Sequence, residues 1–406
     1  MSVTITLPPQ VLRCINTLKT TGHSAYVVGG CVRDSLRGIT PHDWDLTTDA
    51  LPEEIKECFH AYKTIDTGIR HGTVSVLIDH MQLEITTFRT DGEYTDHRRP
   101  DNVFFTSNLE DDLARRDFTI GAMAYHPQKG LIDPFCGQED LKKRRIRCVG
   151  DPIKRFSEDA LRILRAFRFS AQLGFDFDAA TLNGAKDCRH LLGKIAVERI
   201  SSELSRLLLS GNPAKALEAM HHSNVLEAVA PALAAALPAD RYFTVLDHSP
   251  ADIYIRMALL LRCLPPEKGG SLLRELKFDG QTIHKVKKIL TEIAHPPALT
   301  ARDMRFLLHR CGPKTAASVI EVLIADRRID RLARDMLQNT ISFHPCYQIK
   351  DLAVSGTDLK KIGIPANDKM GVVLKYLLNA VLEYPSCNNR DQLLDMAVQK
   401  YNSLVQ

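Results

Sequence analysis

Two short motifs near the N-terminus combine groups that could hold phosphate and a divalent cation. Gly29 and Gly30 end a short apolar run, where N–H groups can approach an anion closely, and a helical pattern starts directly after them. Asp43 and Asp45 stand two residues apart, which places both carboxylates on one face of a strand. Such a pair suits Mg²⁺, which could activate a hydroxyl and neutralise a leaving pyrophosphate. The alternative is a glycine turn followed by a solvent-facing acidic strand.

Glu84 is a third candidate carboxylate. It lies between Leu83 and Ile85 in a predicted strand next to the first one. Burying a carboxylate there is costly unless it is paired or bound to a metal. Glu84 is therefore either a further member of the same site or a side chain on the outward face of its strand.

Paired arginines form a second group of candidates. Arg115 and Arg116 precede Asp117. A guanidinium group can donate two hydrogen bonds to the oxygens of one phosphate. They could clamp a triphosphate, although a surface ion-pair cluster would have the same sequence. A basic run over 142–147 could likewise contact an RNA backbone or simply face solvent.

A third motif, over 158–168, combines charged residues with an apolar helical pattern. Asp159, Arg162 and Arg165 follow an i, i+3, i+6 spacing, which predicts that they share one face of a helix. A carboxylate beside a guanidinium offers acceptors and donors that can read the edge of a base. The simpler interpretation is an ion pair within a surface helix, worth about 0.3–0.5 kcal/mol. We favour contact with a phosphate or base, because three arginines beside one acid, Arg168 included, exceed what pairing needs.

The elements that must position these residues change in type along the chain. Up to about residue 145 short apolar runs predict an α/β fold with an at least partly antiparallel sheet. The predicted elements are a helix over 7–20, strands over 25–28 and 44–47, a helix over 32–36, a hairpin of 73–78 with 82–88, and a strand pair of 123–125 with 131–133. After Gly150 the spacing becomes helical, with breaks at Pro and Gly clusters such as Gly312-Pro313.

The composition excludes several classes of protein. The 406 residues are 44% hydrophobic and 25% charged, which excludes a disordered, collagen-like or fibrous chain. No apolar run approaches the ~18 residues of a membrane span, and the N-terminus does not resemble a signal peptide. The ten cysteines form no C-x-x-C pair, so we expect free thiols in a reducing, cytoplasmic environment and no zinc site. The net charge of +4 permits a nucleic-acid partner without demanding one.

Taken in order, the motifs resemble those of the bacterial tRNA nucleotidyltransferases, class II of the polymerase-beta-like nucleotidyltransferases. The segments that carry the resemblance are GGCVRD, DWD, EITTFR, YTDHRRP, RRDFTI, EDALRILRAFRF and VERISSEL, over about residues 25–210. This family comprises the CCA-adding enzymes and relatives that add only A, only CC or poly(A). The resemblance implies template-independent addition of CCA to tRNA 3′ ends from CTP and ATP, by two-metal nucleotidyl transfer with Mg²⁺.

The resemblance also implies an architecture. An α/β nucleotidyltransferase head over 1–148 would be followed by a helical neck over 149–210 that recognises the nucleobase. A helical body over 211–340 and a helical, tRNA-binding tail over 341–406 would complete the chain. Members are often homodimers, and no membrane partner is expected.

Residue roles follow from the same motifs. Asp43 and Asp45 would bind Mg²⁺, and Glu84 joins them as a catalytic candidate from its place in the neighbouring strand. The residues expected to bind the nucleotide are Gly29, Gly30, Arg33, Arg116, Asp159, Arg162, Arg165 and Arg168. Among these, Asp159 and Arg162 would act as a protein template that selects CTP and then ATP.

Two features depart from the family pattern. The family commonly has Asn where this chain has Gly121, and the glycine is expected to loosen the strand that follows it. Some relatives carry a His-Asp phosphohydrolase domain after the neck. The helical half of this chain has no His-Asp dipeptide, so phosphohydrolase activity is not expected.

Narrower activities are the alternatives within the family. Poly(A) polymerases often end in a basic arm, which is not seen here, and CC-adding relatives are expected to lack part of the loop that holds 95–100. An A-adding enzyme or a poly(A) polymerase stays open as an alternative. A catalytically silent RNA-binding relative is another, and the presence of Asp43 and Asp45 argues against it.

Overall fold

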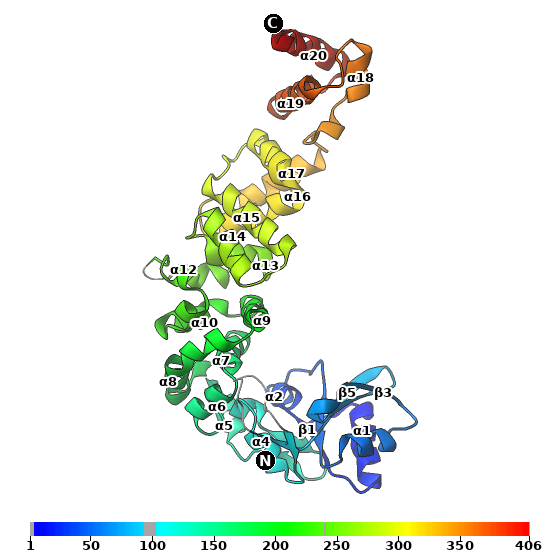
Figure 1. Ribbon diagram of the computed structural model, residues 1–406, viewed down its shortest axis with the longest axis vertical. Coiled ribbons are helices and arrows are strands. Elements are labelled where there is room, and N and C mark those ends of the chain that lie inside the picture. Colours follow the sequence, from blue (N-terminus) through cyan, green and yellow to red (C-terminus); the bar gives the residue numbers. More distant parts are fainter. Residues whose placement is uncertain (1–3, 93–102, 239–240, 406) are drawn as a thin grey trace. The chain divides into compact units, whose positions relative to one another are not determined.

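The computed structural model describes residues 4–92, 103–238 and 241–405. The chain divides into two compact units, Met1–Phe243 and Thr244–Gln406 (Figure 1). The first unit contains the sheet and the second is helical. No helix among the described residues combines the length and the apolar character that crossing a membrane requires.

A seven-stranded mixed sheet forms the centre of the first unit. Its strands lie in the order β3-β4-β5-β2-β1-β8-β9, and all neighbours are antiparallel except the parallel pair β2 and β5. The strands are β1 (Ala25–Val28), β2 (Asp45–Thr48), β3 (Lys63–Gly68), β4 (Thr73–Ile78), β5 (Met81–Thr87), β8 (Ala124–His126) and β9 (Gly130–Ile132). The predicted α/β fold is confirmed, and β3 is a strand that the sequence analysis missed.

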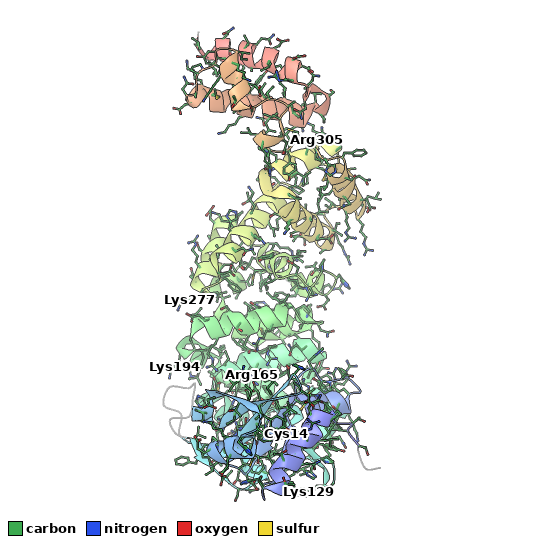
Figure 2. All side chains as sticks on the ribbon, turned by 90° about the vertical axis from the view of Figure 1, so that its right-hand side faces the viewer. Cys14, Lys129, Arg165, Lys194, Lys277 and Arg305 are labelled. Atoms are coloured by element: carbon green, nitrogen blue, oxygen red, sulfur yellow. The ribbon has the colours of Figure 1, made fainter. Side chains whose placement is uncertain are left out.

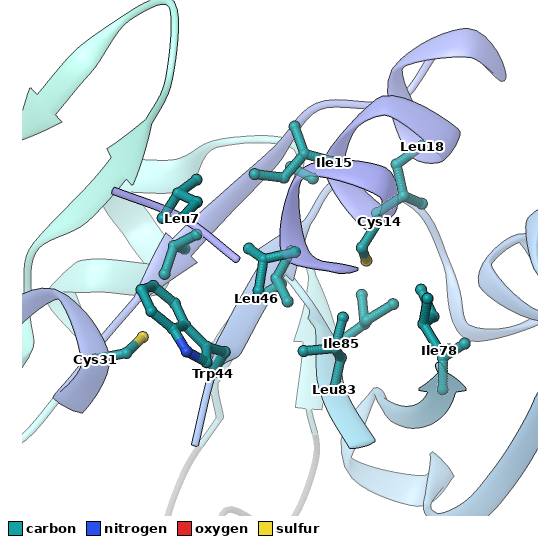
Figure 3. Close-up of a cluster of buried hydrophobic side chains, with 14 of the residues drawn as sticks. Leu7, Cys14, Ile15, Leu18, Cys31, Trp44, Leu46, Ile78, Leu83 and Ile85 are labelled. Atoms are coloured by element: carbon teal, nitrogen blue, oxygen red, sulfur yellow. The ribbon is translucent and has the colours of Figure 1, made fainter. Parts of the chain in front are cut away.

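Side-chain alternation on β2 and β5 places apolar residues on one face of the sheet and carboxylates on the other. Leu46 on β2 and Ile85 on β5 are almost completely buried in a core that also holds Trp44 and the inner side of α1 (Pro9–Thr20) (Figure 3). Because successive side chains on a strand point to opposite faces, the residues next to them, Asp45 and Glu84, face away from this core.

Shorter elements flank the sheet. The helices are α2 (Gly30–Leu36), α3 (Pro52–Cys58), α4 (Leu109–Ala114) and α5 (Gly137–Lys142), with the 3-10 turns η1 (Ile69–His71) and η2 (Thr119–Gly121). Two small ladders join β6 (Arg89–Asp91) to β7 (Val103–Phe105) and β10 (Arg145–Ile146) to β11 (Asp176–Phe177). The strand β8, which follows Gly121, pairs with both β1 and β9.

Helices complete the first unit. They are α6 (Pro152–Glu158), α7 (Leu161–Leu173), α8 (Ala179–Cys188), η3 (Arg189–Lys194), α9 (Val197–Leu208), α10 (Pro213–His222), α11 (Val225–Val229) and α12 (Pro231–Ala234). Helix α7 packs against both α9 and α10 and buries Ile163, Ala166 and Phe167 completely. Its remaining side carries arginines, so α7 presents a charged surface from a rigidly packed helix.

The second unit contains helices throughout, as the spacing predicts. Its helices are α13 (Ile253–Leu261), α14 (Pro266–Glu275), α15 (Gly280–Ala294), α16 (Ala301–Ala325), α17 (Leu332–Ser342), α18 (Gly356–Lys361), α19 (Asp368–Glu383) and α20 (Arg390–Val405). The predicted break at Gly312-Pro313 is a kink inside α16, because Gly312 has φ 72° and Pro313 supplies no N–H donor. All ten cysteines of the chain are free thiols.

The basic run over 142–147 is engaged within the protein. Lys143 pairs with Glu139 and Arg147 with Asp140, while the guanidinium of Arg144 lies over a phenylalanine ring. Lys142, Lys143 and Arg144 are nevertheless exposed, so both interpretations of the run stay open.

We predict that Gly137→Ala destabilises the first unit. A Cβ at this position would lie 2.2 Å from the backbone oxygen of Thr119 in η2, so α5 or η2 must shift. Such overpacking typically costs about 1–3 kcal/mol in the free energy of unfolding. Urea unfolding followed by the fluorescence of Trp44, the only tryptophan of the chain, would measure the loss.

Gly193→Ala is the matched control, because a Cβ there meets nothing within 4 Å. A Gly137→Ala protein that unfolds at the same urea concentration as the wild type would contradict the tight packing of α5 on η2.

Candidate active site

A cavity of about 880 Å³ opens in the first unit on the face of the sheet that carries Asp45 and Glu84. The ends of β1, β2 and β5, the segment between α4 and η2, and the helices α7 and α9 contribute to its walls. It brings together all eleven residues predicted for the site: Gly29, Gly30, Arg33, Asp43, Asp45, Glu84, Arg116, Asp159, Arg162, Arg165 and Arg168. The basic loop residues 95–100 lie outside the described part of the chain.

The three predicted carboxylates lie together on one wall. Asp45 and Glu84 are direct neighbours in the parallel pairing of β2 with β5. Asp43 lies in the bend before β2 rather than on the strand, so the expectation that the strand itself presents both aspartates is wrong. Desolvation raises the pKa of Asp45, and the negative charge of Glu84 raises it further. The positive charge of Arg116 lowers the pKa, and this effect is larger than the small rise caused by Asp43.

This arrangement suits a divalent cation that brings other ligands with it. A cation would relieve the repulsion between Asp45 and Glu84, and carboxylate oxygens are hard ligands. Within residues 4–92, 103–238 and 241–405, no group of three or more His, Cys, Asp or Glu side chains could hold a metal ion. Magnesium sites often contain one or two carboxylates and take their remaining ligands from phosphates and water.

Gly29 and Gly30 form a tight entry into α2. Gly29 has φ 78°, a conformation that other residues rarely adopt, and a Cβ there would lie 3.1 Å from Nη1 of Arg116. The backbone conformation therefore favours glycine, and a larger residue would also crowd the guanidinium of Arg116. On α2, Nε and Nη2 of Arg33 donate to the Asp34 carboxylate at 2.9 and 2.8 Å, which fixes the Arg33 side chain at the cavity wall.

A buried carboxylate holds the paired arginines. Asp112 is fully buried and accepts hydrogen bonds from Nε and Nη2 of Arg115 at 2.9 and 2.7 Å, and from Nη2 of Arg116 at 3.3 Å. The hydroxyl of Thr47 on β2 donates to it at 3.2 Å. Burial alone would raise the pKa of Asp112, but the two guanidinium groups outweigh it and lower the pKa below its ordinary value.

Arginines of α2 and α7 converge on one aromatic ring. Guanidinium carbons of Arg33, Arg165 and Arg168 lie 5.6, 5.6 and 4.1 Å from the ring centre of Phe169. Nε of Arg165 donates to Asp117 at 2.7 Å, and Arg168 forms a buried ion pair with Glu203 on α9. Figure 2 labels Arg165 where α7 meets the α/β part of the unit.

Asp159 does not lie on the helix that carries Arg162 and Arg165, so the prediction of one shared helical face is wrong. It follows the end of α6 in an extended conformation, and α7 begins at Leu161. The reason is local: Oδ1 of Asp159 accepts the N–H of Leu161 at 3.0 Å, as in an Asx turn, which competes with helix formation.

Each member of the predicted base-reading pair has its own partner. Nη2 of Arg199 on α9 donates to Asp159 at 3.0 Å, and Nη1 of Arg162 donates to Glu158 at 2.6 Å. Backbone oxygens of Arg155 and Arg115 accept from the Arg162 guanidinium at 3.2 Å. Asp159 and Arg162 both line the cavity, and each is oriented by its ion-pair partner.

Sequence reasoning missed the residues that orient the others. Asp112 and Glu158 stand three or four residues before their arginines, and this helical spacing was an available signal. Asp117, Arg199 and Glu203 pair with residues 35 to 48 positions away, for which the sequence holds no local signal.

The charge of the cavity defines its class of ligand. Nine arginines and five carboxylates line it, so the walls are strongly positive except around Asp43, Asp45 and Glu84. Positive walls attract phosphates, and the neighbouring carboxylates of Asp45 and Glu84 are ligands of the kind that a cation carried by a phosphate prefers. The mixed sheet and this cavity define a nucleotidyltransferase head.

Comparisons with known proteins agree with this class. The model of the Poly A polymerase head domain matches residues 25–147, that of the "Probable RNA and SrmB- binding site of polymerase A" matches 174–237, and that of tRNA nucleotidyltransferase domain 2 matches 253–397. The CCA-adding enzyme of Limosilactobacillus reuteri is 38% identical over 390 residues, 94% of each chain. That of Leuconostoc mesenteroides is 36% identical over 399 residues, 96% of this chain and 95% of the relative.

Solved structures show the same relationship. The CCA-adding enzyme of Bacillus stearothermophilus in complex with CTP matches with a TM-score of 0.83 and 31% identity, over 98% of this chain and 99% of the other. The Thermotoga maritima CCA-adding enzyme complexed with tRNA, 20% identical, shares the fold with a TM-score of 0.68 over 97% and 96% of the two chains. The chain belongs to the family of CCA-adding tRNA nucleotidyltransferases, which implies the use of a divalent metal.

We predict that Asp112→Asn destabilises the first unit at pH 7. Removing one partner of a buried ion-pair network costs about 3–5 kcal/mol, because the arginines keep their charge. The pKa of Asp112 is lowered in the folded state, so its contribution is present above the ordinary carboxyl pKa of about 3.9 and is lost as the pH falls through the folded value. Urea midpoints measured by Trp44 fluorescence should therefore converge for the two proteins as the pH falls below about 4.

Asp111→Asn on the same helix is the control, since the Asp111 carboxylate accepts from the hydroxyl of Thr106 and does not line the cavity. Equal stability of wild type and Asp112→Asn at pH 7 would show that Asp112 does not hold the paired arginines.

Proposed function

We propose that this protein adds cytidine, cytidine and adenosine in turn to the 3′ end of tRNA, using CTP and ATP without a nucleic-acid template. The observation that carries the proposal is one cavity that combines a carboxylate cluster, arginines suited to a triphosphate and an aspartate–arginine pair suited to a base. Membership of the CCA-adding family supports it.

The head residues would hold the triphosphate. Gly29, Gly30, Arg33 and Arg116 line the cavity where β1 runs into α2, and the N–H of Gly29 itself donates to the backbone oxygen of Met123 at 3.3 Å. Their carboxylate and backbone partners fix them before a ligand arrives, so less reorganisation is needed during the reaction.

Asp43 and Asp45 would hold Mg²⁺, with Glu84 beside them. When bound, magnesium neutralises charge on the phosphates and favours the ionised form of the attacking hydroxyl. Asp45 and Glu84 keep their carboxylates adjacent because the strand pairing fixes both, and Arg116 moderates the negative charge of Asp45.

Asp159 and Arg162 would select the base by hydrogen bonding. Cytosine and adenine each present an amino donor beside a ring-nitrogen acceptor, which suits an aspartate acceptor next to an arginine donor. Uracil and guanine present the reverse order, a carbonyl acceptor beside a ring N–H donor. Their carbonyl would face the acceptor of Asp159, and their N–H would face the donors of Arg162. Arg199 and Glu158 hold the pair in place, so the selection is built into the protein.

The helical regions would hold the tRNA. We keep the division into head (1–148), neck (149–210), body (211–340) and tail (341–406) as part of the proposal, with tRNA contacts in the tail. Separate domain matches over 174–237 and 253–397 are consistent with helical modules of this kind.

We predict that Asp45→Asn abolishes nucleotide addition while CTP still binds. The substitution keeps the shape of the side chain and removes a charge that a divalent cation needs. The assay incubates tRNA that lacks CCA with labelled CTP, ATP or both, and measures product length, with CTP affinity measured by equilibrium dialysis. We expect addition to fall by at least about a thousandfold, because metal-assisted charge neutralisation is lost.

Asp66→Asn is the control, because Asp66 is an exposed residue of β3 outside the cavity. Wild-type product lengths also separate the alternatives: three added residues support CCA addition, one adenosine or a poly(A) tail supports a narrower enzyme, and none supports a silent relative. Full activity of Asp45→Asn would refute the metal assignment.

We predict that Asp159→Ala relaxes base selection. Without the aspartate, the carbonyl acceptor of UTP or GTP no longer faces a second acceptor. Incorporation of UTP and GTP should therefore rise relative to that of CTP and ATP. Single-nucleotide incorporation by the variant with each of the four triphosphates measures the effect. Asp187→Ala, an exposed aspartate of α8, is the control. An unchanged preference for CTP and ATP would leave Asp159 as a structural partner of Arg199 only.

A further inference from the structure

The cavity extends beyond the carboxylates, on the side away from the triphosphate residues. The strand order β4-β5-β2-β1 places Asp45 and Glu84 between β1, which leads into Gly29, and β4. On the β4 side the cavity is lined by four residues to which the proposed function gives no role: His71, Thr73, Thr86 and Arg89.

Two of these residues form a hydroxyl floor. Thr73 on β4 and Thr86 on β5 are cross-strand neighbours, and their hydroxyls lie 2.9 Å apart in a hydrogen bond. Thr86 stands two residues after Glu84, so both side chains lie on the same face of β5. The hydroxyls therefore continue the carboxylate wall without a break.

The other two residues form a basic rim. Nη1 of Arg89 donates to the backbone oxygen of His71, which ties the start of β6 to η1. The turn is closely packed, because a Cβ on the next residue, Gly72, would lie 2.7 Å from the ring of Phe105. The guanidinium of Arg89 is thus tied to the turn beside the hydroxyl floor, and His71, an exposed residue of that turn, lines the cavity with it.

The geometry points to a binding site for the 3′-terminal ribonucleotide of the RNA acceptor on His71, Thr73, Thr86 and Arg89; this inference rests on the proposed function. In the transfer, the 3′ oxygen forms a bond to the α-phosphorus as the bond to pyrophosphate breaks. Pyrophosphate leaves with the electron pair, and the hydroxyl proton passes to water. The entering and leaving oxygens lie roughly in line on opposite sides of the phosphorus.

That requirement decides which side the acceptor occupies. The triphosphate residues lie on the β1 side of the carboxylates, so the hydroxyl must arrive from the β5 and β4 side. The groups found there match an RNA terminus: Arg89 suits the last phosphodiester, and the hydroxyls of Thr73 and Thr86 suit the ribose 2′-hydroxyl. The site therefore recognises both the charge and the sugar of the acceptor.

The test measures the KM for the RNA acceptor and the KM for the nucleotide separately, in the full-length protein. Arg89→Ala should raise the KM for tRNA lacking CCA by about tenfold, the scale of one lost charge-assisted hydrogen bond. The KM for CTP should stay within about twofold, because Arg89 lies on the β4 side of the carboxylates and the proposed triphosphate residues lie on the β1 side. Arg13→Ala is the control for loss of one positive charge, since Arg13 is on the exposed side of α1.

A second variant leaves Arg89 and its turn intact. Thr86→Val keeps the shape of the side chain and removes the hydroxyl, and it should reduce the preference for an acceptor ending in ribose over one ending in 2′-deoxyribose. Thr64→Val on β3, outside the cavity, is its control. Trp44 fluorescence in urea checks that each variant is folded.

The outcomes separate the two proposals. A wild-type protein that adds no nucleotide to tRNA would overturn the proposed function and this inference with it. A wild-type protein that is active, with Arg89→Ala keeping its KM for tRNA and Thr86→Val keeping its ribose preference, would overturn this inference alone. An equal rise of the KM for CTP and for tRNA in Arg89→Ala would also overturn it.

Discussion

The parallel pairing of β2 with β5 is the constraint on which the site depends. It sets Asp45 beside Glu84 on one face of the sheet and Leu46 beside Ile85 on the other, where both apolar side chains are almost completely buried. A slip of one residue would turn the carboxylates into the core and the apolar side chains into the cavity. The hydrophobic core therefore fixes the position of the carboxylates, and the cost of burying charge keeps the register unique.

Many arginines can lie close together in the cavity because several of them form ion pairs with carboxylates. Asp112 holds Arg115 and Arg116, Glu158 holds Arg162, and other acids hold Arg33, Arg165 and Arg168. Each ion pair uses part of a guanidinium and offsets repulsion between neighbouring cations. The positive surface that remains is rigid, which suits a reaction whose transition state is stabilised mainly by fixed charges.

The carboxylates also divide the cavity into two sides. Towards β1 lie the glycine turn and the arginines that suit a triphosphate, and towards β4 lie hydroxyls and a basic turn that suit an RNA terminus. In the proposed function, the order of strands in a single sheet would separate the two substrates. The same order would place the carboxylates between them.

The sequence by itself determined the α/β head, the helical remainder and eleven of the residues that line the cavity. These features follow from short-range patterns: Gly29-Gly30 after an apolar run, acidic residues two apart and arginines at helical spacing. Only the tertiary structure decided which partner holds each side chain. Asp159 meets Arg199, Arg165 meets Asp117 and Arg168 meets Glu203 across 35 to 48 residues, because the packing of α7 against α9 and the sheet brings these segments together. A local pattern can place a charge on an element, but the partner of that charge depends on how the elements pack.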